Sequence, residues 1–224
     1  SSELRFIHWD GYPLESMPAN FKLDKLVELN MPCSLIKQLW KGIKVRFSPM
    51  QNNFLIENIM LQGFNFLNLN NACFITDFER LKLIDLRDSW NLIETPNFSE
   101  VPHLEHLIFQ RCTRLSKIHT SLGDLKQLLR LDLSGCKSLE ILLSKISLES
   151  LEVFILSGCS RLKKFPQIVG NMSRLSHLYL DGTAIKELPS SVEHLTGLVK
   201  LDLSGSAIRE WSFSTFPLGN LEIL

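Results

Sequence analysis

The sequence has no net charge, no long apolar run and no secretory signal. Its 24 basic residues balance its 24 acidic residues, which argues against a nucleic-acid-binding protein, because such proteins usually carry a basic patch. No run approaches the 18 apolar residues that a membrane-spanning helix requires, so we expect no membrane span. The first residues do not form the charged and apolar regions of a signal peptide.

Motifs of catalysis and cofactor binding are also missing. The phosphate-binding pattern G-x-x-x-x-G-K-[ST] does not occur, and no C-x-x-C pair offers zinc spacing. The six histidines are scattered along the chain, so no nucleophile with a neighbouring base can be assembled from them. We therefore expect no enzymatic activity, no cofactor and no metal ion in this chain.

What the sequence does contain is a repeat, which is clearest between residues 151 and 189. Residues 151–156 (L-E-V-F-I-L) are matched by residues 175–180 (L-S-H-L-Y-L). Each segment is followed by a small residue at the same offset, Cys159 or Thr183, and later by an apolar residue and a proline. This is the leucine-rich-repeat pattern L-x-x-L-x-L.

The repeat has a regular period over most of the chain. Two units begin at Leu4 and Leu26, and the later units begin every 23 or 24 residues, at Leu81, Leu104, Leu128, Leu151, Leu175, Leu198 and Leu221. Residues 45–78 break the period, and two interpretations stay open: a degenerate repeat or an irregular insertion. We expect residues 1–224 to form one leucine-rich-repeat domain. It should be a fragment at both ends, because no polar capping unit precedes the first repeat and the last repeat stops within its strand.

The alternation within each unit predicts a short strand with one buried face. One unit cannot bury its apolar side chains alone, so neighbouring units must stack. The expected fold is an α/β leucine-rich-repeat solenoid: a curved horseshoe with a parallel concave sheet and short helical or irregular turns on the convex side. Single helical turns are expected at residues 121–125, 169–172 and 190–195, the last with a serine cap after Pro189.

Three cysteines, Cys112, Cys136 and Cys159, occupy the same position in successive units. A metal or disulfide site is one interpretation. Ser89 and Thr183 fill this position in other units, which favours a ladder of small buried side chains over sulfur chemistry.

Binding is expected on the concave face, where residues beside the strand leucines point outward. Ile108, Val153, Ile155 and Tyr179 are apolar at positions that water should reach, and exposed apolar patches often mark binding sites. The predicted partner-binding residues are His106, Ile108, Arg130, Asp132, Val153, Ile155, His177, Tyr179, Asp181, Lys200 and Asp202. Arg130 and Asp132 lie on one strand face and should screen each other.

Four segments resemble the leucine-rich region of plant TIR–NB–LRR disease-resistance proteins, in particular receptors of the tobacco-mosaic-virus-resistance type. They are residues 4–14 (L-R-F-I-H-W-D-G-Y-P-L), 26–32 (L-V-E-L-N-M-P), 91–98 (N-L-I-E-T-P-N-F) and 180–189 (L-D-G-T-A-I-K-E-L-P). The resemblance implies an intracellular immune receptor in defence signalling, whose repeats sense pathogen effectors and restrain the receptor. In that family, an NAD-cleaving TIR domain and an ADP- or ATP-binding domain lie outside such repeats. Residues 45–78 have no likeness to the family, and their interpretation as a lineage-specific insertion or as translated non-coding sequence stays open.

The resemblance implies a protein partner, either a pathogen effector or the receptor's own nucleotide-binding domain, and a cytoplasmic or nuclear location. The alternative is the ectodomain of a cell-surface leucine-rich receptor. Two N-x-[ST] sequons, at Asn97 and Asn171, fit that alternative. Against it, the sequence lacks L-x-G-x-I-P motifs and paired-cysteine caps, and its cysteines suit a reducing compartment better.

Overall fold

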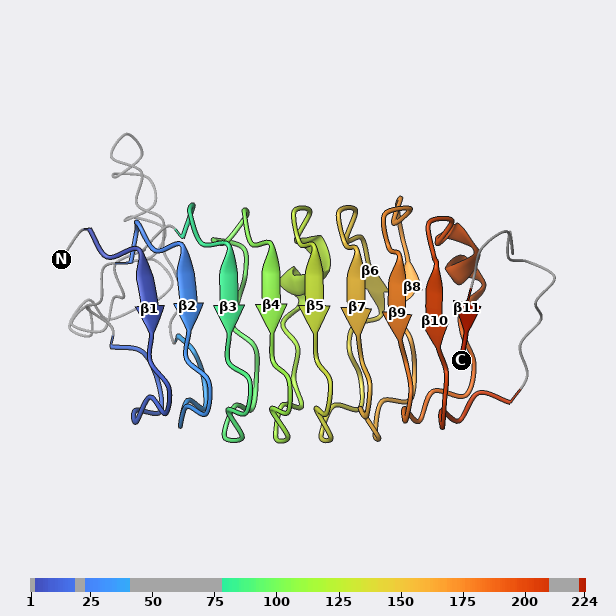
Figure 1. Cartoon of the computed structure of the whole chain (residues 1–224), viewed down its shortest axis with the longest axis horizontal. Helices are drawn as coiled ribbons and strands as arrows, with labels where there is room; N and C mark the ends of the chain where they lie inside the picture. The colour runs from blue at the N-terminus through green and yellow to red at the C-terminus, as the bar shows by residue number, and fades with distance from the viewer. Residues whose placement is uncertain (1–2, 19–22, 41–77, 210–221) are drawn as a thin grey trace, which may run out of the picture.

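The computed structural model describes residues 3–18, 23–40, 78–209 and 222–224 (Figure 1). Within these residues, nine short strands lie side by side in one parallel sheet, in the order β1-β2-β3-β4-β5-β7-β9-β10-β11. The strands are β1 (Phe6–His8), β2 (Glu28–Asn30), β3 (Leu83–Asp85), β4 (His106–Ile108), β5 (Arg130–Asp132), β7 (Val153–Ile155), β9 (His177–Tyr179), β10 (Lys200–Asp202) and β11 (Glu222–Ile223). The predicted repeat solenoid with a parallel sheet is confirmed.

The middle residue of each strand points into the core. Leu107, Leu131, Phe154 and Leu178 are fully buried and lie directly opposite one another across neighbouring strands. The first and third residues of each strand, and the residue two positions later, lie on the other side of the sheet, which we call the open face. Because the side-chain period of a strand is two, stacking equivalent leucines fixes this division along the whole sheet.

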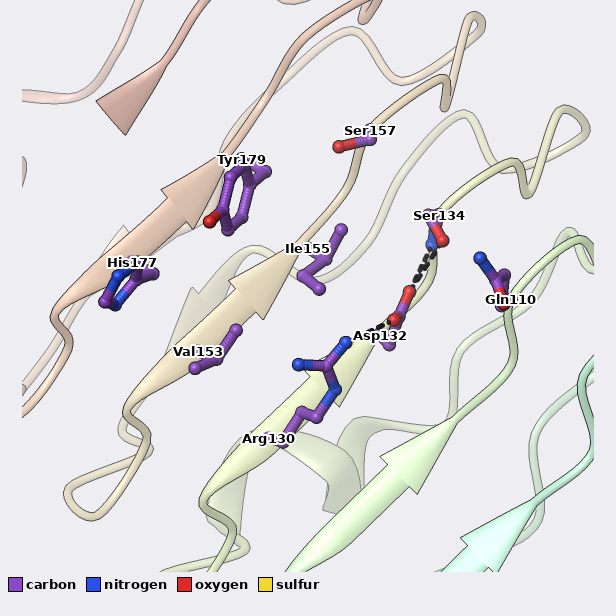
Figure 2. A pocket seen from close by; sticks show the side chains of 9 residues that line it. All are labelled: Gln110, Arg130, Asp132, Ser134, Val153, Ile155, Ser157, His177 and Tyr179. Carbon is purple, nitrogen blue, oxygen red and sulfur yellow. Dashed lines mark hydrogen bonds and ion pairs between the residues drawn. The ribbon is translucent and has the colours of Figure 1, made fainter. Parts of the chain in front are cut away.

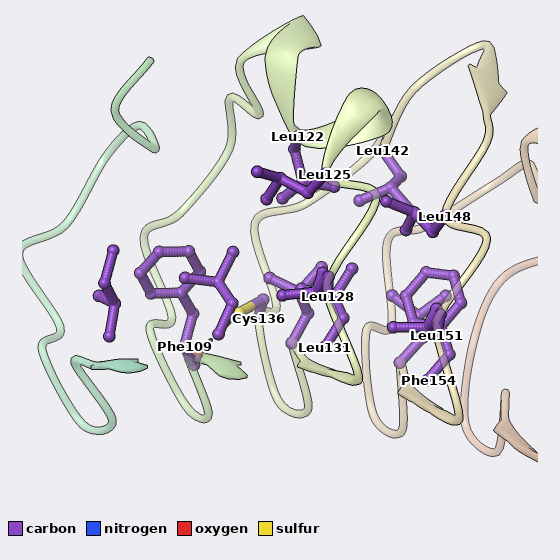
Figure 3. Packing of buried hydrophobic residues seen from close by; sticks show 14 of the residues in the cluster. Phe109, Leu122, Leu125, Leu128, Leu131, Cys136, Leu142, Leu148, Leu151 and Phe154 are labelled. Carbon is purple, nitrogen blue, oxygen red and sulfur yellow. Dashed lines mark hydrogen bonds between the residues drawn. The ribbon is translucent and has the colours of Figure 1, made fainter. Parts of the chain in front are cut away.

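The core lies behind the sheet and is filled mainly by leucine with a few phenylalanines (Figure 3). Phe154 packs against Phe165 with ring centroids 5.9 Å apart. Leu122 and Leu125 close the core on its return side, opposite the sheet (Figure 3). Every repeat therefore contributes one layer to a continuous apolar interior.

The return side carries two 3-10 helices, η2 (Thr120–Asp124) and η3 (Ser190–His194), close to two of the predicted turns. Between them lies a two-stranded parallel sheet of β6 (Lys145–Ile146) and β8 (Gln167–Ile168). No α-helix occurs in the described part of the chain.

Two details of the predicted turns are wrong. Residues 169–172 form no helical turn, since β8 ends there and Gly170 has a φ of 111°, outside the helical range. At η3 the N-cap is Pro189, without a side-chain hydrogen bond. The Ser191 hydroxyl instead accepts a bond from the backbone N–H of Ile168, so it ties η3 to the preceding repeat.

Strands β2 and β3 are direct neighbours in the sheet, although residues 31–82 separate them in sequence. The backbone N–H of Met31 donates to the carbonyl oxygen of Asp85, and Glu28 lies opposite Leu83. Trp40 and Phe78 stack with ring centroids 4.8 Å apart. Of residues 45–78, only Phe78 is among the described residues. The two interpretations of this segment, a degenerate repeat or an insertion, therefore stay predictions.

The three aligned cysteines form the predicted ladder. The thiols of Cys112, Cys136 and Cys159 donate to carbonyl oxygens of the preceding repeat, over 3.1–3.2 Å. All three are fully buried, and burial raises the pKa of Cys112 and Cys159 to about 12. The free thiols link successive layers as small buried donors.

This burial predicts how the thiols react. Since the thiolate is the nucleophile, a pKa of about 12 leaves roughly one thiol in ten thousand ionised at pH 8. In a chain with Cys73→Ser, iodoacetamide should label exposed Cys33 in the native state and the three ladder cysteines only in denaturant, as counted by mass spectrometry. Native labelling of Cys136 as fast as that of Cys33 would show that the ladder is open to solvent.

Candidate functional site

The open face is hollowed into a groove of about 540 Å³ around β7 (Figure 2). Its lining comes from strands β5, β7 and β9 and from the turns that follow β4, β5 and β7. The lining residues are Gln110, Arg130, Asp132, Ser134, Val153, Ile155, Ser157, His177 and Tyr179. They are far apart in sequence and meet because the repeats stack in register.

Side-chain size explains the shape of the groove. Val153 and Ile155 on β7 are short, half-buried and apolar, and they form its floor. The longer side chains of Arg130 on β5 and of Tyr179 on β9 rise on either side (Figure 2). Because β7 carries two small aliphatic side chains and its neighbours β5 and β9 carry larger side chains, a trough runs along β7.

One wall is an internally satisfied ion pair. The Arg130 guanidinium Nη2 donates to Asp132 Oδ2 over 2.9 Å. The other carboxylate oxygen of Asp132 accepts from the backbone N–H and the hydroxyl of Ser134, over 3.1 and 2.7 Å. The predicted screening between Arg130 and Asp132 is confirmed by this ion pair. Asp132 is 5% exposed.

The other wall is aromatic. The rings of His177 and Tyr179 lie nearly parallel, with centroids 6.3 Å apart. The Lys200 ammonium lies 6.0 Å from the centroid of the Tyr179 ring, and His177 Nδ1 is hydrogen-bonded to the Ser176 hydroxyl over 2.8 Å. The Tyr179 ring thus has a second ring and a cation as neighbours before any partner binds.

The groove brings together six of the eleven residues predicted for binding: Arg130, Asp132, Val153, Ile155, His177 and Tyr179. The other five lie elsewhere on the open face or in the turns beside it: His106, Ile108, Asp181, Lys200 and Asp202. Three lining residues were not predicted: Gln110, Ser134 and Ser157. Each stands two positions after its strand, in the same column as Asp181, and that spacing was the signal that could have found them.

The groove offers shape, apolar area and hydrogen bonds. Within the described ranges, no three His, Cys, Asp or Glu side chains come together as metal ligands. No helix in that part of the chain is long and apolar enough to cross a membrane. The groove has an apolar centre inside a polar rim, an arrangement that is common in protein-binding surfaces.

Comparisons with known proteins give these repeats a family. Residues 147–222 match the family described as "Disease resistance protein RPS4B-like, leucine-rich repeats", and residues 25–44 match a general leucine-rich-repeat family. Disease resistance protein RPV1 of Vitis rotundifolia is 41% identical over 127 residues, which are 57% of this chain. The chain is a leucine-rich-repeat region of the plant disease-resistance type.

Other relatives of this leucine-rich-repeat region carry similar names. Disease resistance protein RPP2A of Arabidopsis thaliana is 34% identical over 184 residues, or 82% of the chain, and RML1A of the same plant is 32% identical over 149 residues, or 66%. The chain spans only 7% of RPV1, 11% of RPP2A and 12% of RML1A.

Among solved structures, a leucine-rich-repeat protein of Leptospira interrogans aligns with 94% of the repeat region and 63% of its own chain, at 16% identity and a TM-score of 0.34. That score supports no argument about function.

Proposed function

We propose that this leucine-rich-repeat region is the protein-recognition module of an intracellular plant immune receptor in defence signalling. The groove around β7 binds a protein, either a pathogen effector or the receptor's own nucleotide-binding domain. Recognition requires no cofactor and no catalysis by this chain. The whole receptor's activities belong to domains outside it.

The apolar floor of the groove carries this proposal. Val153 and Ile155 lie side by side on a sheet face that is otherwise mostly polar, and Tyr179 flanks them. Desolvating such a centre stabilises a complex by about 25 cal/mol per Å² of apolar area. Tyrosine is also common among the residues that dominate binding energy.

The charged wall is compatible with protein binding, because its charges are satisfied before a partner arrives. Asp132 accepts three hydrogen bonds within its own strand and the turn that follows. A partner can therefore cover it without leaving a buried carboxylate unpaired, which would cost several kcal/mol.

Substitutions in the groove should weaken binding and leave the fold intact. A photocrosslinking amino acid at position 179, in the chain expressed in leaf tissue, should capture a partner. Ile155→Asp should then lower the affinity for the captured protein by about 30-fold or more, and Tyr179→Ala by a similar factor, equivalent to about 2 kcal/mol. Isothermal titration calorimetry with the purified partner measures both.

Glu193 provides the matched control, because it is exposed on η3, on the opposite side of the repeats. Glu193→Ala should leave the affinity unchanged, and a crosslinker at position 193 should capture little. Efficient capture from position 193 with none from position 179 would place recognition on the return side.

The ectodomain alternative predicts secretion and glycans on Asn97 and Asn171, which mass spectrometry of the plant protein would reveal.

A further inference from the structure

We infer that the groove receives an extended protein segment in which a large apolar side chain is followed closely by a lysine or arginine. The apolar side chain rests on Val153 and Ile155, and the basic group is received by Asp181 and Asp202. The inference rests on the proposed function and adds the chemistry of the partner.

The first observation is an asymmetry of charge along the sheet. In the part formed by β3, β4 and β5, carboxylates and guanidinium groups are paired. Asp85 pairs with Arg87 within one repeat, Asp132 with Arg130, and Asp88 with Arg111 across two repeats. Arginine also holds the pKa of Asp88 below its usual range. This part of the face is neutral and needs no charge from a partner.

Asp181 and Asp202 differ from these carboxylates. Among the described residues, neither forms an ion pair with a lysine, arginine or histidine. Asp181 Oδ1 accepts from the Ser157 hydroxyl over 2.5 Å, and Asp202 Oδ1 accepts from the backbone N–H of Ser204 over 2.9 Å. Both residues are half-buried, so each negative charge is partly desolvated without a cation to compensate it.

Both carboxylates adjoin the groove. The hydroxyl that Asp181 binds belongs to Ser157, which lines the groove next to Ile155. Asp202 lies directly opposite Tyr179 in the strand register. A cation near the ends of β9 and β10 would thus lie close to both carboxylates, at the side of the groove that Tyr179 forms.

The beginning of β10 has the opposite sign. Lys200 occupies the first position of β10, and its ammonium lies over the Tyr179 ring, 6.0 Å from the centroid. A basic group is therefore repelled at the start of β10 and attracted at the ends of β9 and β10. Charge complementarity of this kind selects among partners and fixes their orientation.

A phage-displayed library of random linear 12-residue peptides tests the inference on the folded chain. In peptides that the native chain selects, Leu, Ile or Phe should be followed by Lys or Arg one or two positions later. The double variant Asp181→Asn with Asp202→Asn keeps the accepting oxygens but removes both charges. It should lower the affinity of the best peptide by about threefold to tenfold and abolish the salt dependence of its binding.

Asp124→Asn is the control, because this exposed carboxylate lies on η2 on the return side and its removal should change nothing. Selected peptides that lose affinity with Ile155→Ser but show no basic preference would overturn this inference and leave the proposed function standing. Peptides that bind equally well to Ile155→Ser, or a library that yields none, would contradict both.

Discussion

Leu178→Ala should lower the free energy of unfolding by about 2–5 kcal/mol. Leu178 is fully buried at the centre of β9, where it faces Phe154 on one neighbouring strand and Leu201 on the other. Removing its side chain leaves a cavity between three stacked layers, and layers held by their neighbours cannot collapse to fill it. Urea unfolding followed by circular dichroism measures the loss.

Tyr179→Ala is the matched control, one residue away on the same strand but on the open face. It removes contacts with His177 and Lys200 but opens no internal cavity, so the loss should stay below about 1 kcal/mol. The two variants thus separate folding from recognition. Equal losses would mean that the sheet faces are assigned in the wrong sense.

Gly197→Ala should destabilise the fold by about 3 kcal/mol, although it adds only one methyl group. A Cβ atom at position 197 would lie 1.9 Å from the carbonyl oxygen of Ser173 in the preceding repeat. The obstacle is backbone, so relief requires the two repeats to move apart and to disturb the packing of Leu198 beneath them. Differential scanning calorimetry at matched scan rates measures the shift in melting temperature.

Thr196→Ala, at the exposed neighbouring position, controls for the turn itself and should leave the melting temperature nearly unchanged. The equivalent positions in the two preceding repeats carry Ser150 and Arg174, so the repeat pattern alone would allow a side chain at 197. An unchanged melting temperature for Gly197→Ala would show that the close approach to Ser173 relaxes without loss of packing.

The layer structure could be predicted because it is local and repeated. The alternation around Leu131 or Leu178 specifies which side chains are buried, and the 23- or 24-residue period specifies which residues lie side by side. The cysteine ladder followed from the same logic, since one position admits only small side chains. The open-face columns containing Ile155 and Tyr179 could be named for the same reason.

Other features depend on contacts between repeats and became visible only in the tertiary structure. The groove exists because Val153 and Ile155 are shorter than their neighbours Arg130 and Tyr179, and this difference in height matters only after β5, β7 and β9 are adjacent.

The hydroxyls of Ser134 and Ser157 donate to Asp132 and Asp181. The spacing of these serines predicts their face of the sheet, but the Ser157–Asp181 bond joins two repeats and depends on stacking. Contacts between stacked repeats also explain why β2 pairs directly with β3. They explain as well why β6 pairs with β8, where local propensity predicted a helical turn at residues 169–172. By itself the sequence determined which residues face the core and which lie on the open face. The tertiary structure decided the shape of the open face and the pairing of its charges, because both depend on which side chains the stacked repeats bring together.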